Sequence, residues 1–283
     1  MSEDPDNCKL NQFDKYRLCR YKEGYTFVNR NDNYTVILRE GSKMDVRSEK
    51  HGNTIKDVYV SNVKRGDKIV NPLEKSVYGV GYLGEGAPKY VTKLKSYWMW
   101  KNMLQRCYFT RSDSNNSKYI EDVVVCEEWH CFHNFDKWFN ENYPSDKKGI
   151  NFELDKDMHY ITEVNYKGKK EYSPLTCVFL PKNVNNALVC IDKRLRNRES
   201  GVFRKGKKYK ISMEKDIYFK FKEDAIKVKI TESYLKVKTL LVENKDILKY
   251  ETSEKLKSVL KLLIDLHKEK GELNETSHSV LVC

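Results

Sequence analysis

Two aspartates and a group of asparagines are the residues in this sequence best placed for chemistry at a phosphate. Asp155 and Asp157 stand two positions apart in 151–157, which we predict to be a strand, so both side chains should share one face. A second strand is predicted at 176–180, and the helix after it begins with Asn183, Asn185 and Asn186. Carboxylate and amide oxygens can hold a divalent cation, which stabilises a leaving phosphate oxygen while a general base activates water.

A concentrated positive charge is the second chemical signal. The net charge is +12 and the sequence pI is near 9.1. Between Lys193 and Lys229 the chain has fourteen Lys/Arg and five Asp/Glu, which is a surplus of nine. This pattern favours a polyanionic partner, nucleic acid first and an anionic membrane surface second.

The centre of that basic segment predicts a DNA-binding ribbon. Residues 202–211 form a predicted hairpin with Gly206 near its turn, and a third short strand is predicted at 216–219. A two-stranded ribbon fits the major groove, where lysines bind phosphates and arginines can read bases. The candidate DNA-binding residues are Arg194, Arg196, Arg198, Arg204, Lys205, Lys207, Lys208 and Lys210. The alternative is a solvated basic hairpin that binds nothing.

Two aromatic helices are predicted at about 94–108 and 127–140. Their aromatic side chains recur at helical spacing, which is typical of core packing. Cys126, His130 and His133 follow at i, i+4 and i+7, with Cys131 beside them. Zinc favours Cys and His ligands, so a zinc site is one interpretation of this group. No second half-site lies at zinc-finger spacing, and we therefore favour ordinary polar and core roles for these four residues.

The remaining pattern predicts an α+β fold with three modules. Short strands and turns indicate a small β module at 1–76, the aromatic helices and acidic strand a core at 77–192, and the basic ribbon with two long helices a sheet–helix module at 193–283. The glycine-rich stretch 78–86 lacks the spacing of a nucleotide-binding loop, so we interpret it as an ordinary loop.

Residues 78–188 resemble the phage HNH homing-endonuclease-like proteins. The resemblance lies in four motifs that occur in the same order: Tyr97-x-x-Trp100-x-x-Met103-Leu-x-Arg106-Cys-Tyr, Val125-Cys-x-Glu-Trp129-His-x-Phe-x-Asn-Phe135-x-x-Trp138, Leu154-Asp-Lys-Asp157 and Tyr172-Ser-Pro-x-Thr-Cys-Val-Phe-x-Pro181-x-x-Val-Asn185. It implies a ββα nuclease finger and hydrolysis of DNA phosphodiesters with Mg²⁺ or Mn²⁺.

The resemblance also implies roles for single residues and exposes one departure. Asp155 would be a metal ligand, and Asn185 would be the ligand from the helix. Lys156 occupies the place of the catalytic histidine, and a lysine serves as a base only when burial strongly lowers its pKa. Asp157 or His159 would then have to replace it, which leaves a catalytically inactive DNA-reading scaffold as the alternative.

The basic module resembles the plant ethylene-response-factor DNA-binding domain, which phage homing endonucleases also carry. The matching residues are Gly201-Val-Phe, Lys208-Tyr-Lys-Ile and Phe221-x-x-x-Ala225. The resemblance implies a three-stranded sheet in the major groove, backed by a helix. The usual Leu-Gly before the helix is missing, so the pattern is only partly kept.

Together these features predict a DNA-binding protein, and the resemblance implies that it is a metal-dependent endonuclease. The rival is a repressor or counter-defence factor that binds DNA or a host protein without cutting, and RNA binding is a third class without a supporting aromatic motif. Eight cysteines without C-x-x-C pairs, a polar start and no long apolar run predict reduced thiols, no membrane span and a cytoplasmic location, in a host cell if phage-encoded.

Overall fold

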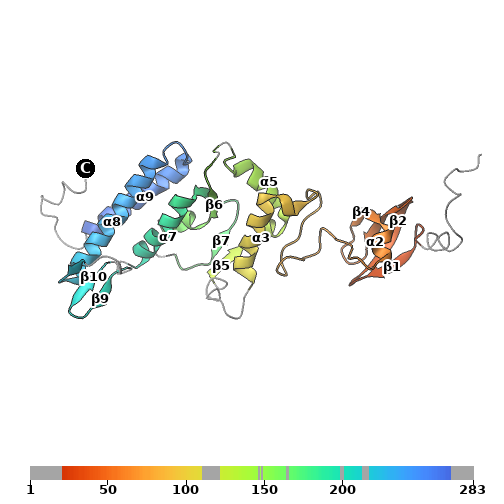
Figure 1. Cartoon of the computed structure of the whole chain (residues 1–283), viewed down its shortest axis with the longest axis horizontal. Coiled ribbons are helices and arrows are strands. Elements are labelled where there is room, and N and C mark those ends of the chain that lie inside the picture. The colour runs from red at the N-terminus through yellow and green to blue at the C-terminus, as the bar shows by residue number, and fades with distance from the viewer. Residues whose placement is uncertain are drawn as a thin grey trace, which may run out of the picture. The chain divides into compact units, whose positions relative to one another are not determined.

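The computed structural model describes residues 21–109, 122–145, 147, 149–163, 166–197, 201–211 and 217–268. The chain divides into two compact units, of which the first ends at Lys89 and the second begins at Tyr90. Helices and several small sheets are both present, so the predicted α+β class is confirmed (Figure 1). None of the helices in the described part of the chain is long and apolar enough to cross a bilayer.

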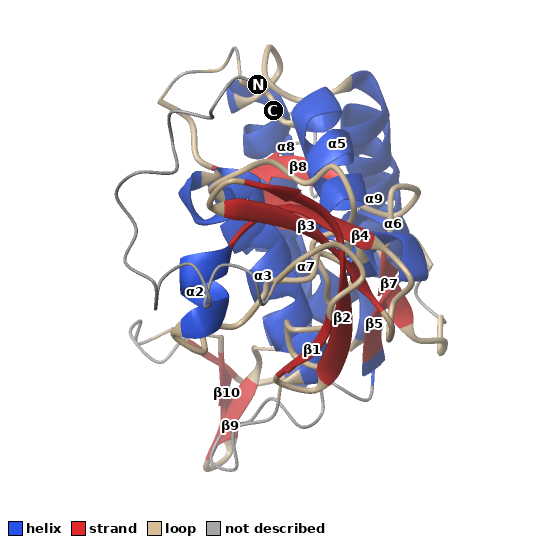
Figure 2. Ribbon diagram, turned by 90° about the vertical axis from the view of Figure 1, so that its right-hand side faces the viewer, coloured by secondary structure: helices blue, strands red, loops and turns tan. Residues whose placement is uncertain are grey.

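The first unit is a four-stranded antiparallel meander, as the alternating sequence predicts. Its elements are β1 (Thr26–Asn29), β2 (Asp32–Glu40), β3 (Lys43–Ser48), β4 (Thr54–Tyr59) and the short helix α2 (Val60–Lys64). Alternate side chains are buried along β3 and in the first half of β2, which gives a small core that includes Val36, Met44 and Val46. The strands curve as one sheet in Figure 2.

The second unit begins with the two aromatic segments. After η2 (Val91–Lys93), helix α3 (Lys95–Tyr108) packs against α5 (Phe132–Asn142). The indole Nε1–H of Trp100 donates to the carbonyl oxygen of Trp129 at 2.7 Å, and both rings are fully buried. The predicted packing role of the aromatic residues is thus confirmed.

The predicted helix at 127–140 is two elements. A 3-10 turn, η3 (Glu127–His130), precedes α5, and extended backbone at Cys131 separates them. Cys126, His130 and His133 therefore do not share one helix face. His130 pairs with the Tyr108 hydroxyl at 3.1 Å, and burial raises the pKa of the Cys126 thiol to about 11, which disfavours the thiolate that zinc requires.

The predicted order of strand, loop, strand and helix is confirmed in the middle of the second unit. Strand β6 (Phe152–Asp155) pairs antiparallel with β8 (Val178–Pro181), and α7 (Lys182–Arg196) follows β8 directly. The connection contains α6 (Asp157–Tyr160) and β7 (Lys170–Tyr172), which pairs parallel with β5 (Val123–Val125).

The basic segment forms the predicted three-stranded antiparallel sheet. The strands β9 (Phe203–Lys205), β10 (Lys208–Lys210) and β11 (Tyr218–Phe219) lie in the order β11-β10-β9. Gly206 takes a φ of +61° in the β9–β10 turn, a conformation that glycine adopts without strain. Helix α8 (Lys222–Glu243) packs against β10 and β11.

Helix α9 (Tyr250–Lys268) runs beside α8 (Figure 1). The sequence predicts that it begins with Ser253 as N-cap, and this is wrong. The helix starts at Tyr250, and the backbone N–H of Ser253 already donates to the carbonyl of Lys249.

One hydrophobic cluster joins the ββα region, α7 and the two C-terminal helices of the second unit. It contains Met158 and Leu180 from the ββα region, Leu188 from α7, Ile230 from α8 and Leu256 from α9. The boundaries that we predict at 76–77 and 192–193 thus lie inside the first unit and inside α7, respectively.

Replacing Leu256 with alanine tests the continuity of this cluster. The side chain is fully buried, so Leu256→Ala should destabilise the second unit by about 2–5 kcal/mol. All four tryptophans lie at 98, 100, 129 and 138, far along the chain from α9, so their fluorescence reports unfolding of the aromatic helices. We expect the urea midpoint of that signal to fall. The exposed control Val242→Ala should leave it in place, and an unshifted signal in Leu256→Ala would mean that α9 unfolds separately.

Candidate functional site

Asp155 ends β6 and is buried, with 6% of its surface exposed. One carboxylate oxygen, Oδ2, accepts the backbone N–H of Met158 at 2.6 Å, which ties the strand end to the first turn of α6. Burial raises the pKa of Asp155 to about 6, and the neighbouring charge of Asp157 adds to this effect. Asp155 therefore has a clear structural role at the turn between β6 and α6.

Asp157 does not share a strand face with Asp155, so that part of the prediction is wrong. Lys156 adopts helical backbone angles, which end the strand alternation, and Asp157 opens α6. Its carboxylate bridges two ammonium groups, with Nζ of Lys156 at 3.0 Å and Nζ of Lys170 at 2.5 Å. Burial alone would raise the pKa of Asp157, but the two lysines outweigh it and hold the pKa below its ordinary value.

Lys156, at the predicted position of the base, is only 3% exposed. Besides its ion pair with Asp157, its ammonium lies 5.0 Å from the ring centroid of Tyr172. The Asp157 carboxylate and the face of the Tyr172 ring both attract the ammonium, so this side chain is held by structural contacts at the position predicted for the base. The other candidate base, His159, packs edge-on against Tyr160, and its backbone carbonyl accepts a hydrogen bond from Lys255 at 2.5 Å.

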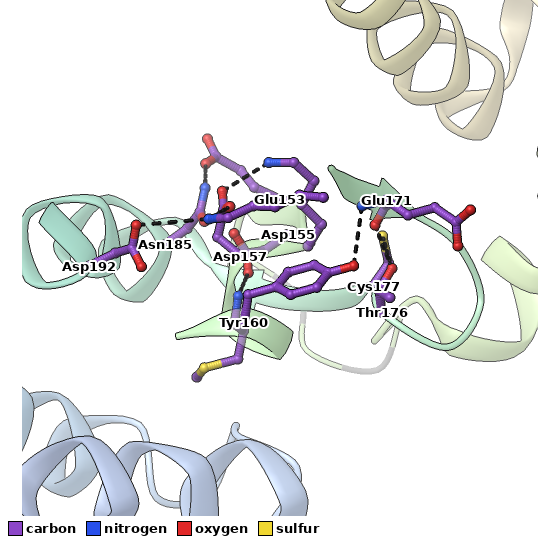
Figure 3. Close-up of polar contacts among 12 residues, drawn as sticks. Glu153, Asp155, Asp157, Tyr160, Glu171, Thr176, Cys177, Asn185 and Asp192 are labelled. Atoms are coloured by element: carbon purple, nitrogen blue, oxygen red, sulfur yellow. Dashed lines mark hydrogen bonds and ion pairs between the residues drawn. The ribbon is translucent and has the colours of Figure 1, made fainter. Parts of the chain in front are cut away.

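Asn185, in the first turns of α7, faces a carboxylate that sequence reasoning missed. Its Nδ2 donates to Oε2 of Glu153 at 2.6 Å. Figure 3 shows Glu153, Asp155, Asp157 and Asn185 gathered where β6 meets α7. Glu153 stands two residues before Asp155 on the same strand, so strand alternation could have identified it.

The predicted pair of metal ligands, Asp155 and Asn185, does not fit a metal site as it is arranged. Asp155 is buried and accepts the backbone N–H of Met158 in the first turn of α6, while the Asn185 amide donates one hydrogen bond to Glu153. Both oxygens of Asp157 are bound to lysines. Over the described residues, no group of three or more His, Cys, Asp or Glu side chains is arranged to hold a metal ion.

The arginines at the end of α7 are held within the fold. Arg194 is 5% exposed, its Nε–H donates to the Ser233 hydroxyl of α8 at 3.1 Å, and burial lowers its pKa. Arg196 pairs with Asp192 at 2.9 Å, and Asp192 lies 3.8 Å from Lys170. Arg194 is thus unavailable to DNA bases, whereas Arg198 lies outside the described residues.

The small sheet brings the other predicted DNA-binding residues together, on two faces. Directly opposed pairs are Lys205 with Lys208, Phe203 with Lys210, and Lys210 with Tyr218. Because opposed residues share a face and neighbours alternate, one face carries Phe203, Lys205, Lys208, Lys210 and Tyr218. We call this set the lysine face. Arg204 belongs to the opposite face, and Lys207 is exposed in the turn.

The lysine face concentrates positive charge around one aromatic ring. The ammonium groups of Lys205, Lys208 and Lys210 lie 5.8, 6.0 and 5.6 Å from the ring centroid of Tyr218. Lys205 also donates to the Tyr218 hydroxyl at 3.3 Å. Lys205, Lys208, Phe203 and Tyr218 are exposed, whereas Lys210 at the centre is buried. Sequence reasoning missed both aromatic members of the face, although strand alternation could have identified Phe203.

A groove of about 270 Å³ adjoins the acidic cluster. It is bounded by α3 on one side and by β6, β7 and α7 on the other. Its lining residues are Lys95, Trp98, Met99, Asn102, Met103, Arg106, Glu153, Leu154, Tyr172 and Asn185. The Glu153–Asn185 pair thus opens into a groove whose other wall carries two cationic side chains.

Comparison of the chain with protein-family models, curated proteins and solved structures finds no match. The resemblances to HNH homing-endonuclease-like proteins and to the ethylene-response-factor domain therefore rest on the sequence motifs alone.

The opposite pKa shifts of the two aspartates predict opposite pH effects on stability. The pKa of Asp155 is higher in the folded state, so its destabilising contribution is absent at low pH and complete above about 6. Relative to wild type, Asp155→Asn should gain stability between about pH 4 and 7, by on the order of 2–3 kcal/mol. Tryptophan-detected urea unfolding across this range measures the gain.

Asp157→Asn is the matched control. Its folded-state pKa is lowered, so its stabilising contribution is present above the unfolded pKa and lost as the pH falls through the folded value. This variant should therefore lose stability relative to wild type at neutral pH. Equal responses of the two variants to pH would contradict the assignment.

Proposed function

We propose that this protein binds double-stranded DNA through the lysine face. The observation that carries the proposal is the cross-strand register, which gathers two exposed lysines, Lys205 and Lys208, and two exposed aromatic rings around the buried Lys210 on one side of a three-stranded sheet. A sheet of this size fits the major groove, and lysines provide the sequence-independent part of DNA affinity. The motif resemblance to DNA-binding proteins supports the same partner.

The lysine face favours contact with phosphates over base reading. Lysine is a compact point charge, whereas arginine, asparagine and glutamine make the bidentate contacts that specify bases. Arg204, the only arginine in β9–β11, lies on the opposite face. Affinity should consequently depend strongly on salt and weakly on sequence.

Removing two exposed lysines tests this binding mode. Lys205→Gln with Lys208→Gln should weaken duplex binding by about ten-fold or more and reduce the slope of log affinity against log salt by about two. Fluorescence anisotropy of a labelled duplex at several salt concentrations measures both quantities. Lys261→Gln, at an exposed position of α9, is the control and should leave affinity and slope close to wild type. Failure of the wild-type protein to bind duplex at low salt would refute the proposal.

We further propose that the protein binds DNA without cutting it at the ββα cluster. The supporting observation is Lys156, which stands in the position of the catalytic histidine and is buried between Asp157 and Tyr172. Asp155 is likewise engaged, as the acceptor for the backbone N–H of Met158 in the first turn of α6. A general base must accept a proton from water. The side chains of Lys156 and Asp155 are both held by the contacts just described, so neither is presented to water as a base.

A plasmid assay tests this part of the proposal. Supercoiled DNA incubated with the protein and Mg²⁺ or Mn²⁺ should remain intact under conditions in which gel shift shows binding. Nicking that is metal-dependent and is abolished in Glu153→Gln or Asn185→Ala, with duplex affinity kept, would show that the cluster is catalytic after all.

A further inference from the structure

The groove beside the acidic cluster has one wall made by a single face of α3. Lys95, Trp98, Asn102 and Arg106 line it at the spacing i, i+3, i+7 and i+11, which follows one side of a helix. All four residues are exposed. The aromatic spacing predicts a packing role for α3, and its buried residues do pack, but this second face has no role in the core.

Trp98 is the central feature of that wall. Its side chain is 49% exposed, although tryptophan is usually mostly buried. Its indole Nε1–H donates to the carbonyl of Thr92 at 2.8 Å, and Tyr97 packs edge-on at 5.7 Å between ring centroids. The ammonium of Lys101 lies 5.3 Å from the indole ring, which adds positive charge at its surface. The indole is therefore a fixed aromatic surface open to a ligand.

The rest of the groove combines an apolar interior with polar groups at its edges. Met99, Met103 and Leu154 contribute apolar surface, while Asn102 and Asn185 contribute amides. A cavity of about 150 Å³ is enough to bind benzene, so about 270 Å³ accommodates a larger planar heterocycle. Lys95 and Arg106 place positive charge at the two ends of the α3 wall.

We propose that this groove binds a nucleotide of an unpaired DNA strand, with the base stacked on Trp98, the amides of Asn102 and Asn185 at the base edge, and Lys95 or Arg106 at the phosphate. An aromatic surface beside cationic groups is the usual arrangement for binding single strands without sequence preference. An unpaired nucleotide is required because in a duplex both faces of each base are covered by its neighbours.

The inference rests on the proposed function, since that function makes DNA the partner, but it uses different residues. The lysine face binds the duplex backbone, and the groove would bind a base that has left the stack. A free nucleotide has the same chemistry as a nucleotide within a strand, so the experiment must include both.

Trp98→Ala tests the groove in the full-length protein. Anisotropy with a short labelled single strand should show binding weaker by about ten-fold, since base stacking on an aromatic ring supplies this much per base. Trp98→Phe keeps a stacking ring and should retain most of the affinity. Tyr250→Ala removes an even more exposed aromatic residue, which lies on α9 and does not line the groove, and should have no effect.

Duplex binding in the same variants separates this inference from the proposed function. Trp98→Ala should bind duplex like wild type, which also shows that the protein is folded, whereas the lysine-face double variant should lose duplex affinity whatever happens at Trp98. Unchanged single-strand affinity in Trp98→Ala overturns the inference alone. Competition by free deoxynucleoside monophosphate as strong as that of the unlabelled strand would overturn the assignment to a DNA strand.

Discussion

The packing of α7 is the constraint on which the second unit depends. Its apolar side presents Val184, Leu188 and Ile191 to the cluster that includes the ββα strands and both long C-terminal helices. One helix thereby fixes two regions at once, because Asn185 near its start faces Glu153 while Arg194 near its end is held against α8. Enclosing the Arg194 guanidinium costs free energy, because its Nη1 has no hydrogen-bond partner among the described residues. Burial of the continuous apolar face of α7 stabilises the fold and offsets this cost.

The same packing determines what the acidic cluster can do. Enclosing Asp157 favours partners that neutralise it, and Lys156 and Lys170 provide two. Lys170 in turn lies near Asp192, so a chain of alternating charges links α6, β7 and α7. Residues that the sequence suggests for catalysis thus have structural roles. The chemistry open to solvent lies beside the cluster, in the groove along α3, and on the lysine face.

Periodicity was sufficient to predict most elements of the fold. The aromatic spacing predicts α3, the order of β6, β8 and α7 follows from apolar runs and Pro181, and the hairpin around Gly206 follows from its turn residue. Errors occurred where one residue left the expected backbone geometry. Helical angles at Lys156 separate Asp155 from Asp157, and extended angles at Cys131 divide the second aromatic helix.

The candidate sites were harder to predict because they depend on contacts between distant segments. The positive charge of Arg194 suggested that it binds DNA, but this prediction ignored its position on the helix. Its spacing from Ala187 and Ile191 places it on the buried face of α7. The groove joins α3 to β6 and α7, which no local pattern reveals. The lysine face was partly accessible, since alternation separates Arg204 from Lys205, but Tyr218 joins it only through the pairing of β11 with β10.

Amide chemical shifts in the ¹⁵N-lysine-labelled protein measure whether the lysine face contacts the DNA backbone, as we propose. Titration with a duplex should shift the signals of Lys205, Lys208 and Lys210 together, with lysines of α9 unaffected. Shifts confined to lysines outside the sheet, with β9 and β10 unchanged at saturation, would show that DNA binds elsewhere on the protein.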